Sequence, residues 1–499
     1  PAARSARVDP MTAPVTIEIA LISHTNAGKT TLARTLLGRD VGEVRDAPHV
    51  TETAESHTLI TSPDGDVLCL TDTPGFGDSA RLVQRLRVAD NPLGWLLREV
   101  WDRHRDRPFW CSQQAVRAAR DGADVVLYLV NAAEDPGDAG YVALEMQVLR
   151  WVGKPVLVLL NQAGPPRGAE DEGRDVERWR AHLAPHGIVN DVLAFDAFAR
   201  CWVQERVLLD AIAAALPVDR RSALARLQSA WERSSIERFD ASMRVLADEL
   251  AAAARDAEPV GGETASTAQK LLRSVGVGRR DADPARERAM AALAERLDAA
   301  IRAATDRLIT LHGLEGSATQ AVLERMQENF AVPAQVDEGR AALLGSIVTG
   351  ALTGLKADLA AGGLTFGAGM LVGGVVGGLA GAGLARGVNV LRGAEYPAVR
   401  WSEDFLDGLV RSSVLRYLAV AHFGRGRGRY VEGEAPSFWK GEVEQAMAEQ
   451  RETLHAAWQD ARSGDGTVDG RLADVVAVVT ARALERLYPG RVPAALLDR

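Results

Sequence analysis

Residues 23–31 combine a lysine, three threonines and small residues in a spacing that suits phosphate chemistry: they read S-H-T-N-A-G-K-T-T. They directly follow the apolar run 15–22, and a strand that enters a loop ending in Gly-Lys-Thr and opening a helix is typical of a phosphate-binding P-loop. In such a loop, backbone N–H groups surround the β-phosphate, Lys29 places its charge beside the β- and γ-phosphates, and the Thr30 hydroxyl binds Mg²⁺. The helix that follows points its positive end at the same phosphates. The nucleotide-binding residues predicted from this loop are Ser23, Asn26, Ala27, Gly28, Lys29, Thr30 and Thr31.

A second apolar run, 67–71, ends in Asp72-Thr73-Pro74-Gly75. In P-loop proteins an acidic residue at the end of a strand holds a water on Mg²⁺, as we expect of Asp72. Gly75 has no Cβ, so its backbone N–H can approach the γ-phosphate. The two motifs together predict a site for a nucleoside triphosphate with Mg²⁺.

The composition restricts the classes of function. The formal charge of −9 disfavours a general nucleic-acid binder, which would be basic. The three cysteines, Cys69, Cys111 and Cys201, have no metal-ligand spacing, which indicates a reducing cytoplasm. The first methionine is Met11, and residues 1–14 are expected to form a disordered N-terminal extension without the apolar stretch of a signal peptide.

Strands and helices alternate over residues 15–217, which predicts an α/β domain with a doubly wound, mainly parallel six-stranded sheet. The runs 125–130 and 156–160 are continuously apolar, as in strands that are buried on both faces. In this fold, ligands bind at the carboxyl ends of the strands. The six predicted strands are 15–22, 56–61, 67–71, 124–130, 156–160 and 192–195.

The rest of the chain is predicted to be all-α, because apolar residues recur there at steps of three and four. We expect a helical bundle over 218–335, a glycine-rich apolar helical hairpin over 336–395, and a C-terminal helical region over 396–499 that packs with the bundle. In the hairpin, Gly369, Gly373, Gly377 and Gly381 fall every four residues, which allows close contact between helices.

The apolar segment 341–385 leaves two alternatives open. It is long enough to enter a bilayer, so one alternative is a peripheral or conditionally inserted element at the inner face of the cell membrane. Its many glycines add nothing to insertion, and Lys356 and Asp358 would oppose it. The other alternative is therefore a hairpin buried within the protein.

Residues 23–31 and Asp72-Thr73-Pro74-Gly75 resemble the Era/TrmE-like branch of the translation-factor-related GTPases. The resemblance implies GTP and GDP as ligands, with Mg²⁺. Members of this branch carry an asparagine that matches Asn26, and in potassium-activated members it helps to hold K⁺ where an arginine finger would lie. A cation there neutralises charge that develops during hydrolysis.

The same resemblance implies a switch threonine that completes the Mg²⁺ shell together with Thr30 and, through water, Asp72. Thr51 fits because Pro48 precedes it, and Thr53 is the second choice. Phe76 stands where Ras-like enzymes place a water-orienting glutamine, so we expect slow intrinsic turnover, stimulated by dimerisation of the GTPase domains. The residues expected to act in catalysis are Lys29, Thr51 and Gly75.

The base-recognition motif departs from that of the family. The family has Asn-Lys-x-Asp, whose aspartate binds guanine, whereas this chain has Asn161-Gln162-Ala163-Gly164. We expect Asn161 and Gln162 to bind nucleotide, and guanine selectivity must come from elsewhere. Asp196, just after the last predicted strand of the sheet, is a candidate.

Over its whole length the chain resembles a bacterial family of Era-like GTPases with a C-terminal domain of unknown function. Arg400-Trp401-Ser402, the stretch from Arg416 to Phe423 and the Gly-Arg repeat at 424–429 carry this resemblance. The leading hypothesis is a slow nucleotide-dependent switch that acts on the helical domain. The alternatives are a dynamin-like GTPase that self-assembles on membranes, and a structural protein that binds nucleotide without hydrolysing it. The expected partners are a second copy of the chain, a membrane surface at 341–385 and an unidentified protein.

Overall fold

The computed structural model of the chain describes residues 13–24, 27–38, 55–88, 106–163, 169–197, 201–259, 284–314, 388–391, 398–423, 437–463 and 468–499. The chain forms two compact units, one of Pro1–Ile236 with His422–Gly428 and the other of Glu237–Ala421 with Arg429–Arg499. The boundary falls inside α9 (Val218–Arg255), a helix of 38 residues.

The first unit contains the predicted six-stranded sheet. Its strands are β1 (Thr16–Ser23), β2 (Glu55–Thr61), β3 (Val67–Asp72), β4 (Val125–Asn131), β5 (Val156–Asn161) and β6 (Val189–Ala194). The spatial order is β2-β3-β1-β4-β5-β6; β2 pairs antiparallel with β3, and the other neighbours pair in parallel. Every residue of β5 is buried, as expected of an apolar strand inside a parallel sheet. The predicted α/β fold class is confirmed.

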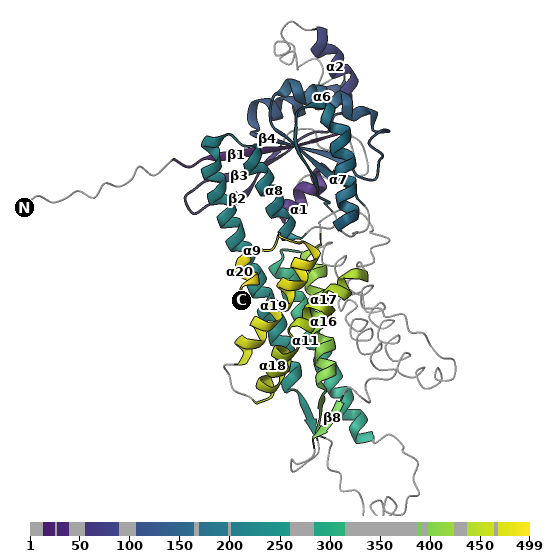
Figure 1. Cartoon of the computed structure of the whole chain (residues 1–499), viewed down its shortest axis with the longest axis vertical. Helices are drawn as coiled ribbons and strands as arrows, with labels where there is room; N and C mark the ends of the chain where they lie inside the picture. The colour runs from purple at the N-terminus through teal and green to yellow at the C-terminus, as the bar shows by residue number, and fades with distance from the viewer. Residues whose placement is uncertain are drawn as a thin grey trace, which may run out of the picture. The chain divides into compact units, whose positions relative to one another are not determined.

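Helices cover both faces of this sheet (Figure 1). The helices of the first unit are α1 (Lys29–Leu37), α2 (Ser79–Val88), α5 (Arg107–Arg117), the π-helix η1 (Ala118–Gly122), α6 (Gly140–Val152), α7 (Ala169–Leu183), the 3₁₀-helix η2 (Ala184–His186) and α8 (Trp202–Ala215). One apolar core contains Leu82 of α2, Met146 of α6 and Trp179 of α7. The core on the other face contains Leu32 of α1 and Ile212 of α8. The parallel strands therefore end at one edge, where a ligand has room to bind.

The second unit is mostly helical, as predicted. Its helices after α9 are α11 (Pro284–Leu311), α16 (Glu403–Ala421), α17 (Ser437–Glu449), α18 (Arg451–Ser463), α19 (Val468–Leu487) and α20 (Ala494–Leu497). α19 packs on α17 and α18, and α16 packs on α11 and α17. α11 begins at Pro284, a residue whose missing N–H and fixed φ suit the first turn of a helix.

A small sheet in the second unit corrects the all-α prediction in detail. β7 (Ala257–Pro259), β8 (Val388–Leu391) and β9 (Ala398–Trp401) form an antiparallel sheet in the order β7-β9-β8. The helical hairpin predicted over 336–395 is therefore wrong at its end, where the sequence V-N-V-L, with two β-branched valines, forms β8. The remainder of that hairpin, including the glycine repeat, and residues 1–12 lie outside the described residues. Among the helices that the structure describes, none has the length and apolar character needed to cross a membrane.

Candidate functional site

The P-loop links the end of β1 to the start of α1, and Gly28 is its tightest point. Gly28 has φ +86°, in the region that favours glycine. A Cβ at this position would lie 2.6 Å from Asn161 Nδ2 at the end of β5. Both the backbone conformation and the space therefore require glycine here.

Lys29 lies inside this loop with little exposure to solvent. Its Nζ donates a hydrogen bond of 3.0 Å to Ser23 Oγ, so the serine that replaces the first glycine of the motif accepts from the lysine. Burial lowers the pKa of Lys29, while the nearby Asp72 and Glu145 carboxylates oppose this shift. The Lys29 side chain is thus placed at the P-loop by its bond to Ser23, where a bound phosphate would add a counter-charge.

Thr30 and Asp72 meet across the site. Thr30 Oγ1 donates a hydrogen bond of 2.6 Å to Asp72 Oδ2, and Asp72 Oδ1 is buried with no hydrogen-bond partner among the described residues. Burial raises the pKa of Asp72, whereas Lys29 and the Thr30 hydroxyl lower it. A hydroxyl beside an unsatisfied carboxylate oxygen is a donor set that suits Mg²⁺. The residues present therefore fit the metal that the motif implies.

The Asp72-Thr73-Pro74-Gly75 segment is tied to the P-loop through its backbone. Phe76 N donates to Ser23 O at 2.9 Å, and the Thr73 hydroxyl donates to Leu21 O. Gly75 precedes Phe76 at this junction, so its N–H belongs to a segment that β1 positions. The Phe76 side chain is fully buried, so this position offers no polar group to an attacking water.

The Asn161 side chain, at the end of β5, forms hydrogen bonds with the P-loop and with the segment after β6. Its Nδ2 donates to Ala27 O at 2.8 Å in the P-loop, and its Oδ1 accepts from Ala197 N at 2.8 Å after β6. Gln162 adopts φ +58°, which is uncommon for a residue other than glycine. Its side chain also extends over the P-loop, since Nε2 lies 3.6 Å from a Cβ placed on Gly28.

Asp196 lies at the same corner of the sheet. Its Oδ2 accepts a hydrogen bond of 2.8 Å from Ala163 N, one residue before Gly164, where the family carries its base-reading aspartate. Gly164 itself lies outside the described residues. The chain thus brings a carboxylate from the end of β6 to the corner where the motif at the end of β5 lacks one.

Most of the predicted site residues that the structure describes come together at this edge. The P-loop residues Ser23, Ala27, Gly28, Lys29 and Thr30 lie with Asp72, Gly75, Asn161 and Gln162 around the ends of β1, β3 and β5. Thr31 is buried within α1, and its carbonyl accepts the Thr35 hydroxyl. Asn26 and Thr51, assigned above to K⁺ and to Mg²⁺, and the second choice Thr53 lie outside the described residues.

The sequence reading missed Glu145, a fully buried acid on α6 that contacts the P-loop residue His24. A signal was available, because Glu145 follows Val142 by three residues and precedes Leu149 by four, on the apolar stripe of the helix. An acidic residue on such a stripe requires a polar partner inside the fold.

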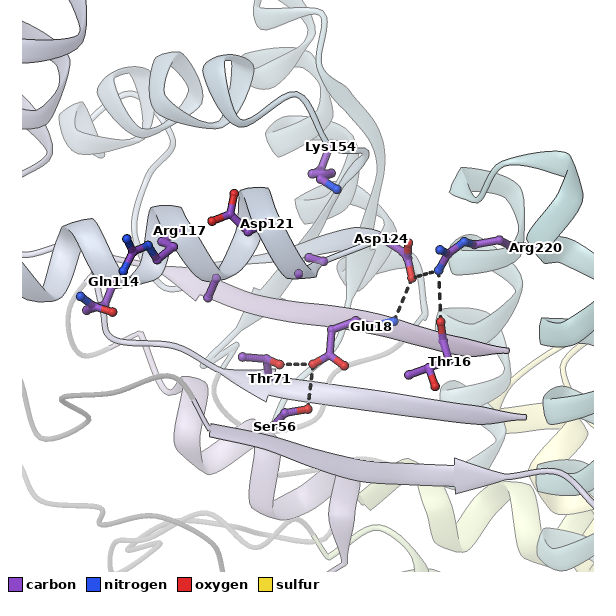
Figure 2. A pocket seen from close by; sticks show the side chains of 13 residues that line it. Thr16, Glu18, Ser56, Thr71, Gln114, Arg117, Asp121, Asp124, Lys154 and Arg220 are labelled. Atoms are coloured by element: carbon purple, nitrogen blue, oxygen red, sulfur yellow. Dashed lines mark hydrogen bonds and ion pairs between the residues drawn. The ribbon is translucent and has the colours of Figure 1, made fainter. Parts of the chain in front are cut away.

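A separate hollow of about 750 Å³ lies beside the sheet, between β1–β3 and the α5–η1 segment (Figure 2). On its floor, Glu18 Oε1 accepts the Ser56 hydroxyl at 2.8 Å and the Thr71 hydroxyl. At its end, Asp124 Oδ2 accepts from Glu18 N at 3.0 Å and from Arg220 of α9 at 2.5 Å. None of the described lining residues belongs to 23–31 or 72–75. We interpret these contacts as an anchor for the start of α9 rather than as part of the nucleotide site.

Comparison with known families divides the chain into two parts. Residues 18–162 match the family described as "50S ribosome-binding GTPase". Residues 181–475, more than half of the chain, match the family described as "Domain of unknown function (DUF3482)".

Individual relatives are distant. The chain is 24% identical over 278 residues to GTPase Der of Xanthomonas axonopodis pv. citri (strain 306), which covers 52% of this chain and 50% of that protein. It is 26% identical over 273 residues to GTPase Der of Myxococcus xanthus (strain DK1622), covering 51% and 50%. The chain thus spans about half the length of the curated relatives that it matches.

Similar solved structures include a variant of Era from Aquifex aeolicus bound to GDP·AlF₄⁻, with 18% identity and a TM-score of 0.30 over 41% of this chain and 57% of that one. The FeoB G-domain of Methanococcus jannaschii gives 16% identity and a TM-score of 0.21 over 43% and 99%. From the two family matches, the chain belongs to the family defined by the domain of unknown function DUF3482 and carries a P-loop GTPase domain ahead of it.

Proposed function

We propose that this protein is a slow GTPase that acts as a nucleotide-dependent switch, binding and hydrolysing GTP with Mg²⁺. The observation that carries the proposal is the pair Thr30 and Asp72. The Thr30 hydroxyl lies 2.6 Å from Asp72 Oδ2, and Asp72 Oδ1 is buried with no hydrogen-bond partner among the described residues. This arrangement stands beside Lys29 in a loop that only glycine at position 28 allows.

The phosphate- and Mg²⁺-binding residues have distinct roles in this proposal. Lys29 binds the β- and γ-phosphate oxygens, and the Gly75 N–H binds the γ-phosphate. Thr30, Thr51 and, through water, Asp72 hold Mg²⁺, which neutralises charge on the phosphates when it is bound. The P-loop backbone from Ala27 to Thr30 surrounds the β-phosphate, where the positive end of α1 adds its dipole.

Slow turnover follows from Phe76. Its side chain is fully buried, and it stands where a glutamine would orient the attacking water. Without that glutamine, the transition state of hydrolysis must be stabilised by other groups. We assign part of this stabilisation to a K⁺ held with the help of Asn26, and part to a second copy of the GTPase domain. Replacing Na⁺ with K⁺ in a turnover assay tests the role of Asn26, because an unchanged rate contradicts it.

Guanine selectivity is assigned to Asp196. Its carboxylate contacts Ala163 N beside the position that lacks the family's aspartate. Guanine presents two donors, N1–H and the N2 amino group, to an acceptor at this corner, whereas adenine presents an acceptor at N1. A carboxylate therefore favours guanine over adenine.

The switch acts, in this proposal, on the helical unit. Support comes from α9, whose first part belongs to the GTPase unit and whose second part belongs to the helical unit. Arg220 and Arg226 near its start bind Asp124 and Asp66 of the GTPase unit, so a change in that unit is transmitted to a continuous helix. Engagement of a membrane through 341–385 remains part of the proposal on composition alone.

The test measures the affinities of the full-length chain for GTP, GDP and ATP with Mg²⁺, together with phosphate release. We expect GTP to bind more tightly than ATP, phosphate release to be slow, and Lys29→Ala and Asp72→Ala to abolish both activities. Lys154→Ala is the matched control, because Lys154 lines the hollow beside η1 and is not part of the P-loop. A chain that binds no GTP, or for which Lys29→Ala behaves like Lys154→Ala, contradicts the proposal. Binding without phosphate release would instead favour a structural nucleotide-binding protein.

A further inference from the structure

Glu145 is a fully buried acid on α6 whose carboxyl group accepts hydrogen bonds from three other elements. Oε1 accepts from Ser79 Oγ at 2.8 Å and from His24 Nδ1 at 2.8 Å, and Oε2 accepts from Tyr128 Oη at 2.6 Å. Three groups from different elements thus converge on one carboxyl group that solvent does not reach. A buried carboxylate is costly unless it is fully bonded, so these donors must stay in reach.

Two of the three donors come from the segments that meet the phosphates. His24 follows Ser23 in the P-loop. Ser79 is the first residue of α2 and lies four residues after Gly75. The backbone makes the same connection, because Phe76 N donates to Ser23 O at 2.9 Å.

The side chains around the Glu145 carboxyl group make further contacts of their own. The His24 ring stacks on Tyr141 with centroids 4.4 Å apart, and the Tyr141 hydroxyl donates to Glu134 at 2.9 Å. Burial, followed by the Glu145 charge, raises the pKa of Tyr128 well above its usual value, so its hydroxyl remains a donor. Glu145 therefore sits in a site where a lost donor cannot be replaced by solvent.

We propose that Glu145 is a positioning residue that ties the start of α2 to the P-loop and thereby makes the site prefer a nucleotide with a γ-phosphate over one without. While Ser79 stays bonded to Glu145, the four-residue connection keeps Gly75 against the P-loop, where its N–H meets the γ-phosphate. Binding of the γ-phosphate in turn favours the bonded position of Ser79, since coupling between two sites is reciprocal. This inference rests on the proposed binding of GTP at the P-loop.

Ser79 and Tyr128 offer a matched pair for the test. Ser79→Ala and Tyr128→Phe each remove one hydroxyl donor to the same carboxylate, but only Ser79 belongs to the segment after Gly75. The helix cap survives the first change, because Asp78 Oδ1 accepts from Arg81 N at 3.0 Å at the start of α2. Ser79→Thr keeps the hydroxyl and serves as the conservative rescue.

The experiment measures the affinities of the full-length chain for GDP and for a non-hydrolysable GTP analogue, with Mg²⁺, and the thermal midpoint of each variant. Ser79→Ala is expected to lower the affinity for the analogue, relative to that for GDP, by about tenfold, which is within the range of known coupling energies. Tyr128→Phe is expected to lower the thermal midpoint while the ratio of the two affinities stays at the wild-type value, and Ser79→Thr is expected to keep that ratio.

Four outcomes would overturn the inference. If Ser79→Ala and Tyr128→Phe change the ratio equally, or if neither changes it, Glu145 only stabilises the fold and the proposed GTPase function is untouched. If the wild-type chain binds GDP and the analogue equally well, the site has no preference for a γ-phosphate, and Glu145 cannot be its cause. If the wild-type chain binds no guanine nucleotide, the proposed function fails together with the inference.

Discussion

At the scale of single residues, Gly28 and Gly38 differ in a way that can be used. Both have positive φ, +86° and +63°, and they flank the same helix, α1. A Cβ on Gly38 would meet nothing within 4 Å, whereas a Cβ on Gly28 would collide with Asn161 Nδ2 at 2.6 Å. Asn161 could retreat only by losing its bonds to Ala27 and Ala197.

We therefore expect Gly28→Ala to weaken nucleotide binding by more than about tenfold, because it displaces the residue that joins the P-loop to the ends of β5 and β6. Gly38→Ala should cost about 1 kcal/mol of stability through its backbone conformation and leave nucleotide affinity unchanged. Calorimetric titration with GDP, alongside thermal unfolding of both variants, separates the two effects. Equal losses of affinity in both would mean that strain alone matters and that the contact with Asn161 does not.

A second prediction at the scale of single residues concerns Asp196. Asp196→Asn replaces a carboxylate oxygen by an amide donor, which repels the N1–H and N2 amino donors of guanine and suits the C2 carbonyl of xanthine. We expect affinity for GDP to fall and affinity for xanthosine diphosphate to rise, both measured by competition against a fluorescent nucleotide. Gly164→Asp in the Asp196→Asn background, which restores the family's carboxylate, is expected to recover GDP binding. Parallel losses for both nucleotides would assign Asp196 a structural role through its bond to Ala163 alone.

The motif residues were predictable because their chemistry is local in sequence. Lys29 and Thr30 follow a strand and a glycine, and Asp72 ends another strand, so the spacing alone predicts a shared site. Asp196 was a candidate because it follows the last predicted strand of the sheet, but its contact with Ala163 could not be predicted from the spacing. Glu145 was missed, because it reaches the site from α6 through a contact with His24, and no spacing rule connects it to the P-loop.

At the scale of elements, Asp66 in the turn before β3 forms an ion pair with Arg226 of α9. Its Oδ1 accepts from Val15 N at 3.1 Å and from Arg226 Nη2 at 2.9 Å, and its Oδ2 accepts from Ser62 Oγ at 2.9 Å and Arg226 Nε at 2.7 Å. The Arg226 hydrogen bonds lower the pKa of Asp66 to about 2 against the opposing effect of burial, and the Val15 and Ser62 bonds add to the shift.

Because the folded-state pKa lies below that of an unfolded aspartate, about 3.9, the stabilisation is complete above pH 4 and is lost as the pH falls toward about 2. We expect Asp66→Asn to lower the free energy of unfolding by about 1–3 kcal/mol at pH 7, and the difference from wild type to shrink between about pH 4 and pH 2. Denaturant unfolding at a series of pH values checks this. Asp64→Asn is the control, since Asp64 is exposed and lies 3.6 Å from Arg226. If the loss of unfolding free energy in Asp66→Asn stays constant down to pH 2, the ionised Asp66–Arg226 pair is not its cause.

The elements themselves divide by length into those that the sequence predicts and those that it does not. The long apolar runs of β4 and β5 and the repeated leucines of α9 and α11 leave little choice of secondary structure. The four-residue strands β8 and β9 are too short to show a period, and they form because β9 pairs with β8 on one side and with β7 on the other. Packing then fixes them: the Trp401 ring at the end of β9 stacks on Phe405 of α16, with centroids 4.1 Å apart.

At the scale of the whole molecule, several residues that carry the resemblance outside the GTPase domain, among them Trp401, Arg416 and Tyr417, are buried in the core of the helical unit. Arg416 of α16 forms a buried ion pair with Glu249 of α9, and Tyr417 packs edge-on against Phe239. A buried pair of this kind is costly to break, although replacing both charges by apolar groups is often neutral. The pair thus fixes how α9 and α16 meet, which gives the helical end of α9 a defined partner.

If the switch reaches a membrane, the segment 341–385 is the part of the chain with the composition to enter it. We expect the full-length chain to sediment with vesicles of phosphatidylethanolamine and phosphatidylglycerol when a non-hydrolysable GTP analogue is bound, and to remain in the supernatant with GDP. The difference arises because insertion of a glycine-rich segment is close to balance, so that a small conformational change decides it. Gly373→Glu with Gly377→Glu adds two charges, each costing about 3 kcal/mol in a bilayer, and should abolish sedimentation without changing nucleotide affinity. A chain that is monodisperse in buffer and ignores vesicles with every nucleotide would instead mean that 341–385 is buried within the protein, and the same two charges would then reduce its stability.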